Sequence, residues 1–184
     1  MGVGVILLAV VVLMLLGAMA AYNGLVRMRQ QVKSAWAQID VQLKRRHDLI
    51  PNLVETAKGY LAHERQTLEN VTKARSQAVD ASALKDKTQA ENALTQTLRS
   101  HFAVVERYPD LKASQNMLAL QEELTTTENR ISFARQFYND EAMRFNTAID
   151  TVPSNLIAGL TGVTKVEFFE LEDPAHRDVP KVTF

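Results

Sequence analysis

Charged and amide side chains crowd residues 40–55, the segment whose residue types are best suited to chemistry. It reads DVQLKRRHDLIPNLVE and holds guanidinium, carboxylate, imidazole and amide groups at close spacing. Such groups form a binding site when they converge on a ligand, and form ion pairs and caps when they only stabilise a turn. Both interpretations stay open from the sequence, with structural pairing favoured. The interaction candidates are Arg45, Arg46, Asp48, Asn52 and Glu55.

Two further interaction candidates, Asn139 and Asn146, stand seven residues apart. Seven residues make almost two helical turns, so both amides lie on one face of a helix. An amide at such a position sets the register of packed helices or contacts a partner.

Patterns typical of catalytic and metal sites are missing from the sequence. Di-iron helical bundles use Glu-x-x-His pairs, and none of the four histidines has Glu three positions before it. A zinc-protease helix needs a second histidine four residues after the first, and Thr67 occupies that position after His63-Glu64. There is no cysteine and no glycine-rich phosphate loop. We therefore expect no catalytic residue, cofactor or metal ion, and a protein that is not an enzyme.

The charge distribution divides the chain into two parts. Its 184 residues hold 21 Lys+Arg and 21 Asp+Glu, and a neutral total offers no field that concentrates nucleic acid, so no nucleic-acid partner is expected. All of these charges lie after residue 26. Before them, residues 3–22 are apolar or small throughout, and about 20 such residues span the roughly 30 Å core of a bilayer as a helix. This segment predicts a single transmembrane helix that contacts membrane lipids.

A cleaved signal peptide is the rival interpretation, since Ala18-Met19-Ala20 resembles a cleavage site. The first ten residues contain no Lys or Arg and the apolar run is long, which favours a retained anchor. Arg27, Arg29 and Lys33 follow the anchor, so the positive-inside rule favours a cytoplasmic soluble domain, with a periplasmic one as the alternative.

Apolar residues recur every three or four positions along the rest of the chain, as in helices that bury one face. The first stripe runs from Leu25 to Leu43. No breaker separates it from the membrane segment, so we expect one helix to leave the bilayer and to end near Leu49-Ile50. The reason for this end is Pro51, which disfavours helical geometry at the preceding residue and lacks an N–H.

Three further helices are expected, over residues 51–79, about 90–105 and 114–150. The sequence thus predicts an all-α protein in which an N-terminal transmembrane helix, residues 1–22, continues into an antiparallel four-helix bundle with long helices, residues 23–153. Residues 154–184 are expected to form a tail packed on the bundle, with a short strand or a helical turn. Long stripes of this kind, as in coiled coils, close within one chain or extend into a second copy.

Several segments spread over nearly the whole chain resemble the LemA family. They are Tyr22–Val26, Ala35-Trp36, Asp40–Val54, Gly59-Tyr60, Tyr108–Lys112, Leu120–Leu124, Thr127-Glu128, Ala134–Asp140, Phe145-Asn146 and Phe168-Phe169. The resemblance implies a bacterial inner-membrane protein with one N-terminal span and a helical bundle, linked to membrane organisation or proteostasis. It implies no reaction and no catalytic residues.

The expected function is that of a non-enzymatic scaffold or interaction module at the inner membrane. A homo-oligomer or a membrane-protein partner is expected with it. The alternative is an adaptor or regulator of a membrane protease or another membrane enzyme, with residues 40–55 as the working site.

Overall fold

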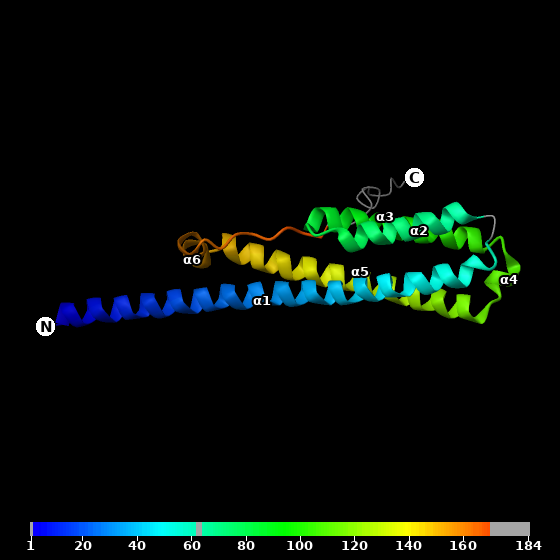
Figure 1. Cartoon of the computed structure of the whole chain (residues 1–184). Helices are drawn as coiled ribbons and strands as arrows, with labels where there is room; N and C mark the ends of the chain where they lie inside the picture. The colour runs from blue at the N-terminus through cyan, green and yellow to red at the C-terminus, as the bar shows by residue number, and fades with distance from the viewer. Residues whose placement is uncertain (1, 62–63, 170–184) are drawn as a thin grey trace, which may run out of the picture. The chain divides into compact units, whose positions relative to one another are not determined.

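The computed structural model describes residues 2–61 and 64–169, and within them every regular element is a helix (Figure 1). The all-α prediction is therefore confirmed. The helices are α1 (Gly2–Lys58), α2 (Arg65–Asp80), α3 (Leu84–Val105), α4 (Pro109–Lys112), α5 (Gln115–Asp150) and α6 (Ser154–Thr161).

Helix α1 contains the apolar N-terminal segment. It reaches a mean hydropathy of 2.9 over an 18-residue window, and none of that window is buried. By length and composition this helix is able to cross a membrane. As expected, no break separates the apolar segment from the charged part that follows.

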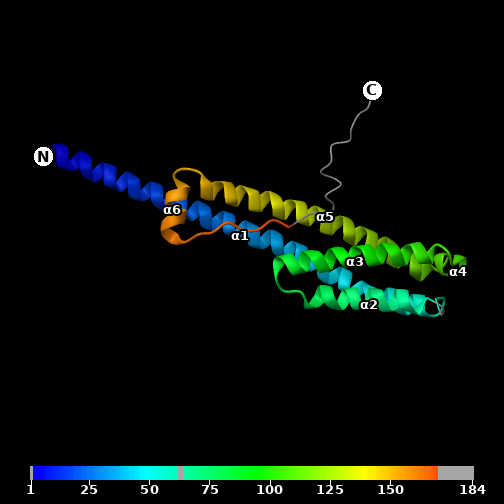
Figure 2. The same cartoon turned by 90° about the horizontal axis from the view of Figure 1, so that it is seen from above.

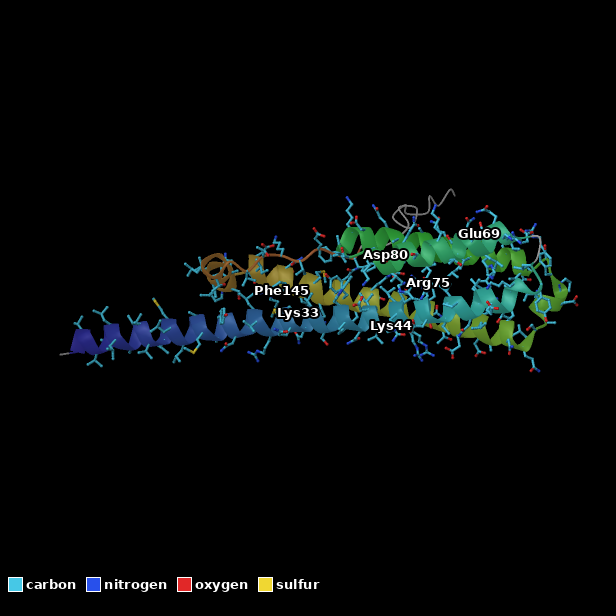
Figure 3. The ribbon with its side chains drawn as sticks, in the orientation of Figure 1. Lys33, Lys44, Glu69, Arg75, Asp80 and Phe145 are labelled. Carbon is cyan, nitrogen blue, oxygen red and sulfur yellow. The ribbon has the colours of Figure 1, made fainter. Side chains whose placement is uncertain are left out.

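The predicted end of this helix near Leu49-Ile50 is wrong, because α1 continues through Pro51 to Lys58. A proline inside a helix leaves the carbonyl four residues earlier without its usual N–H donor. Here that carbonyl belongs to His47, and Arg75 Nε of α2 donates to it at 2.7 Å. Figure 3 shows Arg75 pointing from α2 toward α1. The helix therefore tolerates Pro51, because a side chain from a neighbouring helix replaces the missing donor.

Helix α1 accordingly ends at Lys58 and α2 begins at Arg65, so the helix is interrupted in the middle of the second predicted helix. Gly59 follows the last residue of α1, and the N–H groups of Tyr60 and Leu61 both donate to the Ala57 carbonyl. The residues expected to form one stripe over 51–79 are thus divided between two helices. They still reach one core, which is why their apolar spacing carried no sign of the turn.

Most of the later boundaries agree with the prediction, but α3 begins at Leu84, six residues before the predicted start near residue 90, because its polar first turns carry no apolar stripe. Helix α3 ends at Val105, before Tyr108-Pro109, and α4 begins at that proline. Helix α5 covers Gln115–Asp150, within one residue of the predicted range. The short strand proposed for the tail does not form in residues 163–169, whereas the helical turn does, as α6. Residues 170–184 of the predicted tail lie outside the described residues.

The described chain forms two compact units that both draw on α1 and α5. One unit comprises residues 41–131, in which four helical segments share an apolar core. Helices α2 and α3 of this unit lie side by side in both views (Figures 1 and 2). Core side chains come from each segment, including Ile50, Leu53, Val71, Ala78, Leu94, Leu98, Met117 and Leu124.

The other unit comprises residues 2–40 and 132–168. Its long segments, from α1 and α5, run side by side in both views. Trp36 and Tyr138 meet edge to face between them, with ring centroids 5.5 Å apart. The buried side chains that pack here include Leu25, Val32, Ile39, Ala142 and Phe145.

The contact that replaces the missing donor at Pro51 makes a direct prediction. Replacing Arg75 with alanine is expected to lower the free energy of unfolding by about 1–3 kcal/mol, because the His47 carbonyl then lacks a partner. Pro51→Ala restores an N–H at position 51, so Arg75→Ala should cost clearly less in that background. Chemical denaturation of the detergent-solubilised variants measures both losses. Equal losses in the two backgrounds would show that Arg75 does not act through this carbonyl.

Candidate functional site

Arg46 is completely buried, and its guanidinium group collects partners from two other helices. Its Nη1 donates to Thr95 Oγ1 at 2.8 Å and to Glu128 Oε2 at 2.5 Å. Its Nη2 donates to the Glu91 carboxylate and, at 3.3 Å, to the Glu91 backbone carbonyl. Thr95 Oγ1 also lies 3.2 Å from Glu128 Oε1. One side chain of α1 thus joins α3 and α5.

His47 extends this group, since its Nε2 lies 2.9 Å from the second oxygen of Glu91. We call Arg46, His47, Glu91, Thr95 and Glu128 the Arg46 cluster. Because Arg75 of α2 binds the His47 carbonyl, the cluster and its neighbour connect all four long helical segments of this unit. The sequence interpretation placed the partners of Arg46 along residues 40–55, whereas the structure brings them from α3 and α5.

The electrostatics of the Arg46 cluster are those of a largely buried ion-pair network. Burial by itself raises the pKa of Glu91, but the neighbouring His47 and Arg46 lower it more, so this pKa lies below its usual value. Glu91 is fully buried and its carboxylate contacts Arg46 and His47. The second carboxylate, Glu128, is 36% exposed and is the part of the ion pairs that solvent reaches. The buried pairs join α1, α3 and α5.

The remaining candidates of residues 40–55 lie on the surface of α1. Arg45 pairs with Glu123 of α5 at 2.6 Å, and both side chains are nearly half exposed. Asp48 pairs with Lys44, and Glu55 pairs with Lys58, each within one turn of α1. These pairs contribute little to stability because they are exposed, and the same exposure makes the side chains accessible to a partner.

Asn52 is exposed and lines a shallow groove with Glu55. The other lining residues are Thr56, Asn116, Ala119 and Leu120. The structure therefore brings two of the predicted interaction candidates, Asn52 and Glu55, to one surface of α1 and α5.

Asn146 is used inside the protein. Its amide donates to the Val166 carbonyl and accepts from the Val166 N–H, both at 2.9 Å. One amide side chain thus pairs with a backbone peptide as a neighbouring strand would. Tyr138 Oη donates to the Glu167 carbonyl at 2.8 Å, and Lys165 pairs with Asp150. These contacts hold residues 165–167 against α5. Asn139, the other amide candidate, is half-buried on the same helix.

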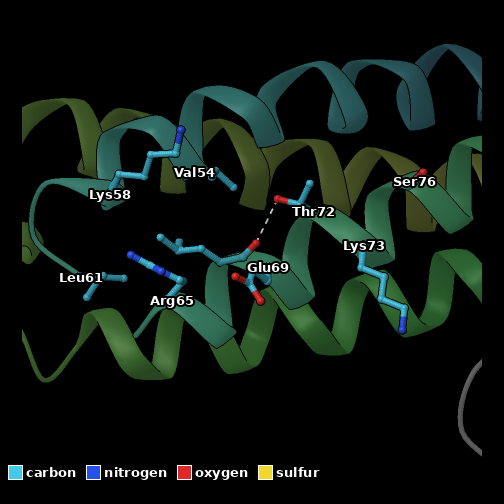
Figure 4. Close-up of a pocket in the computed structure, with 9 residues that line it drawn as sticks. Val54, Lys58, Leu61, Arg65, Glu69, Thr72, Lys73 and Ser76 are labelled. Carbon is cyan, nitrogen blue, oxygen red and sulfur yellow. Dashed lines mark hydrogen bonds between the residues drawn. The ribbon is translucent and has the colours of Figure 1, made fainter. Parts of the chain in front are cut away.

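A larger groove lies between the end of α1 and α2, with a volume of about 850 Å³ (Figure 4). Its floor is apolar, with Leu61 and Leu68 buried, and cationic side chains stand around it. Of these, Arg65 and Lys73 make no hydrogen bond or ion pair with any other residue among those that the structure describes. We call this the α1–α2 groove; its lining is Val54, Lys58, Leu61, Arg65, Leu68, Glu69, Thr72, Lys73 and Ser76.

Four buried polar residues of α3 escaped the sequence interpretation: Thr88, Glu91, Thr95 and His101. The signal was available, because Glu91 stands three positions before Leu94 of the apolar stripe and His101 stands three positions after Leu98. A titratable residue on an apolar stripe predicts a buried polar group. His101 is fully buried, neither ring nitrogen has a hydrogen-bond partner among the described residues, and burial lowers its pKa to about 4.

Among the described residues, no group of three or more His, Asp or Glu side chains is arranged to hold a metal ion. His63 and His176 lie outside the described residues.

The sequence of this chain is similar to those of known proteins. Magnetosome protein MamQ of Magnetospirillum gryphiswaldense is 26% identical, over 88% of this chain and 68% of its own length. Protein LemA of Metamycoplasma hominis is 28% identical, over 85% of this chain and 72% of its own length. The LemA family model matches residues 35–184, which include every residue of the Arg46 cluster and of the α1–α2 groove. The chain therefore belongs to the LemA family.

Proposed function

We propose that this protein is a non-enzymatic scaffold of the bacterial inner membrane, which holds a partner membrane protein at the α1–α2 groove. The observation that carries the proposal is the groove itself, whose edge holds Arg65 and Lys73, two cations that have no partner among the described residues. The apolar N-terminal part of α1 supplies the anchor.

The membrane placement follows from the residues that flank the anchor. Exposed Arg27, Arg29 and Lys33 follow the apolar segment, whereas no charged side chain precedes it. Cationic residues beside a span are retained on the cytoplasmic side, and this rule supports a cytoplasmic soluble part. Anionic lipid headgroups attract the same cations.

The occupant that fits the α1–α2 groove is an acidic amphipathic segment of a protein partner. Half-buried Val54 and the aliphatic parts of the groove's lysine and arginine side chains offer an apolar surface above the buried Leu61 and Leu68, of the kind that receives the apolar face of a helix. Around them Arg65 and Lys73 carry two positive charges against one negative charge on Glu69, while Lys58 is paired with Glu55. This excess favours glutamate and aspartate on the edges of the bound segment and disfavours a basic one.

A photo-crosslinking amino acid at Thr72, which lines the groove, tests the proposal in cells that express the full-length protein. We expect crosslinked peptides from a membrane protein that combine an apolar stripe with acidic residues. The double variant Arg65→Glu, Lys73→Glu should lose about nine-tenths of the crosslink, since two reversed charges of roughly 0.7 kcal/mol each make a tenfold change in affinity. Quantitative mass spectrometry of the crosslinked peptides gives the result.

The matched control is Lys85→Glu, a charge reversal on an exposed side chain of α3 outside the groove, and it should leave the crosslink intact. A crosslink that survives the double variant would overturn the proposed groove. A crosslink only to a second copy of this chain would show that the groove serves self-assembly and holds no other protein. A membrane protease among the specific partners would favour the adaptor role.

A further inference from the structure

Helix α6 is an uncharged helix that exposes large aliphatic side chains. Residues 151–164 contain no Asp, Glu, Lys or Arg. Within them Leu156 is 64% exposed and Leu160 is 85% exposed, one turn apart on the same face. Val152, just before the helix, is exposed as well. Three neighbouring apolar side chains in an uncharged stretch form a surface that water solvates poorly.

The opposite face of α6 holds it on the protein. Ala158 is buried, and Gly162, with φ of +68°, ends the helix in the left-handed conformation that glycine adopts without strain. The contacts of Asn146 and Tyr138 with residues 166 and 167 then fix the following segment on α5. Because Ala158 is buried and the segment after α6 is fixed, the exposed Leu156 and Leu160 lie on the outward face of α6.

Helix α6 belongs to the same compact unit as the apolar part of α1. Residues 2–17 of α1 are exposed, and the first covered positions are Ala18, Ala21, Gly24 and Leu25. In both views α6 lies beside α1 at the start of its covered part and nearest to the exposed N-terminal part. Figure 1 shows α6 end-on while α1 runs across the page, and Figure 2 shows α6 crossing α1. The two helices therefore run at a large angle to each other.

We propose that α6 is a second membrane contact, which lies in the interface of the bilayer with Val152, Leu156 and Leu160 in the acyl region. A helix that crosses a spanning helix at a large angle lies along the membrane plane. Interfacial helices of this kind place their apolar face roughly 5–10 Å into the boundary between headgroups and acyl chains. The exposed Arg27 and Arg29 follow on α1, where lipid phosphates would meet them.

This inference rests on the membrane placement of α1 in the proposed function. It goes beyond that function by giving the unit that contains α6 a fixed orientation relative to the bilayer. One spanning helix leaves a domain free to tilt and rotate. A second contact at its base restricts both motions. The partner that α6 recognises is thus the lipid surface itself.

Spin labels on single cysteines test the placement of α6, because the natural sequence contains no cysteine. Full-length variants Leu156→Cys, Leu160→Cys and Thr161→Cys are labelled and reconstituted in vesicles of phosphatidylethanolamine and phosphatidylglycerol. Thr161 is the matched control, since it is exposed on another face of α6. The label at Val12→Cys gives the collision rates expected inside the membrane span, and the label at Ser100→Cys gives those expected in water. Collision with oxygen and with a water-soluble nickel chelate gives the depth of each label.

We expect the labels at positions 156 and 160 to collide with oxygen as the label at position 12 does, and the label at 161 to collide more with the nickel chelate. Water-like collisions at 156 and 160 beside a lipid-exposed position 12 would overturn this inference alone. Labels at 156 and 160 shielded from both agents would also overturn it, because protein would then cover α6. A water-exposed label at position 12 would overturn the membrane placement itself, and with it the proposed function.

Discussion

Replacing Arg46 with alanine is expected to lower the free energy of unfolding by about 3–5 kcal/mol, because the change leaves the buried Glu91 carboxylate without its cation. For a protein of this size, a loss of that order lowers the midpoint of thermal unfolding by roughly 10 °C. Thermal unfolding of the purified full-length protein in detergent, followed by circular dichroism, measures the shift. The effect is large because both partners are withdrawn from water.

The adjacent Arg45 provides the matched control. Its pair with Glu123 is nearly half exposed on both sides, so Arg45→Ala should cost about 0–1 kcal/mol. The double variant Arg46→Met, Glu91→Met removes both buried charges and should recover most of the loss, since apolar side chains replace such pairs without penalty. Similar losses for Arg45→Ala and Arg46→Ala would contradict the burial argument, and would return Arg46 to the group of surface candidates.

Lowering the pH from 6.5 toward 4 is expected to destabilise the protein through His101. Burial lowers the pKa of this imidazole from 6.5 to about 4, so between these values the unfolded chain binds a proton that the folded chain rejects. Stability is therefore fully present above pH 6.5 and falls as the pH drops through this window. The total loss is about 3 kcal/mol, at 1.36 kcal/mol for each unit of pKa.

The variant His101→Leu should abolish the pH dependence in this window and keep or raise stability at neutral pH, because it also removes two ring nitrogens that lack a partner among the described residues. A second loss, below about pH 4.5, should persist, since the lowered pKa of Glu91 makes its contribution disappear only as the pH falls through that lower value. Denaturation midpoints from about pH 3 to pH 8 test both parts, because the range then includes the lowered pKa of Glu91. A pH profile unchanged by His101→Leu would show that another group titrates in this window.

The positions of most helices are predictable from the sequence because their apolar stripes are regular. The stripe from Leu25 to Leu43 and the long run from Met117 to Phe145 bury the residues that their spacing predicts. The X-Pro step at Tyr108-Pro109 also ends a helix, as expected. These features depend on neighbours within one or two turns, and such neighbours are visible in a sequence.

Pro51 shows where local reasoning fails. The residue removes a hydrogen bond from its own helix, and that loss predicts a helix end. The compensating donor, Arg75, lies 24 positions further along the chain and reaches the His47 carbonyl only after α2 has folded back on α1. The position of the first turn was therefore decided by a tertiary contact.

The candidate site likewise combines features that the sequence predicts with features that only packing decides. The unusual charge content of residues 40–55 is evident in the sequence, but the sequence interpretation did not separate the buried Arg46 from the exposed Arg45 beside it. Neighbours on a helix differ in direction by about 100°, and Arg46, three positions after Leu43, continues the apolar stripe of α1 whereas Arg45 lies off it. The spacing therefore indicated burial, but the partners that α3 and α5 supply were visible only in the structure. Burial then turns one arginine into the centre of an ion-pair network and leaves the other at the surface.

The sequence by itself determined the all-α class, the uncharged span, the stripes of the long helices and the membership of a family. The tertiary structure decided the passage of α1 through Pro51, the partners of Arg46, the isolation of His101 and the position of α6 beside α1. The physical reason is the separation along the sequence over which each interaction acts. Helix formation and hydrophobic spacing act between residues a few positions apart, whereas desolvation and ion pairing depend on which distant residues packing brings into contact.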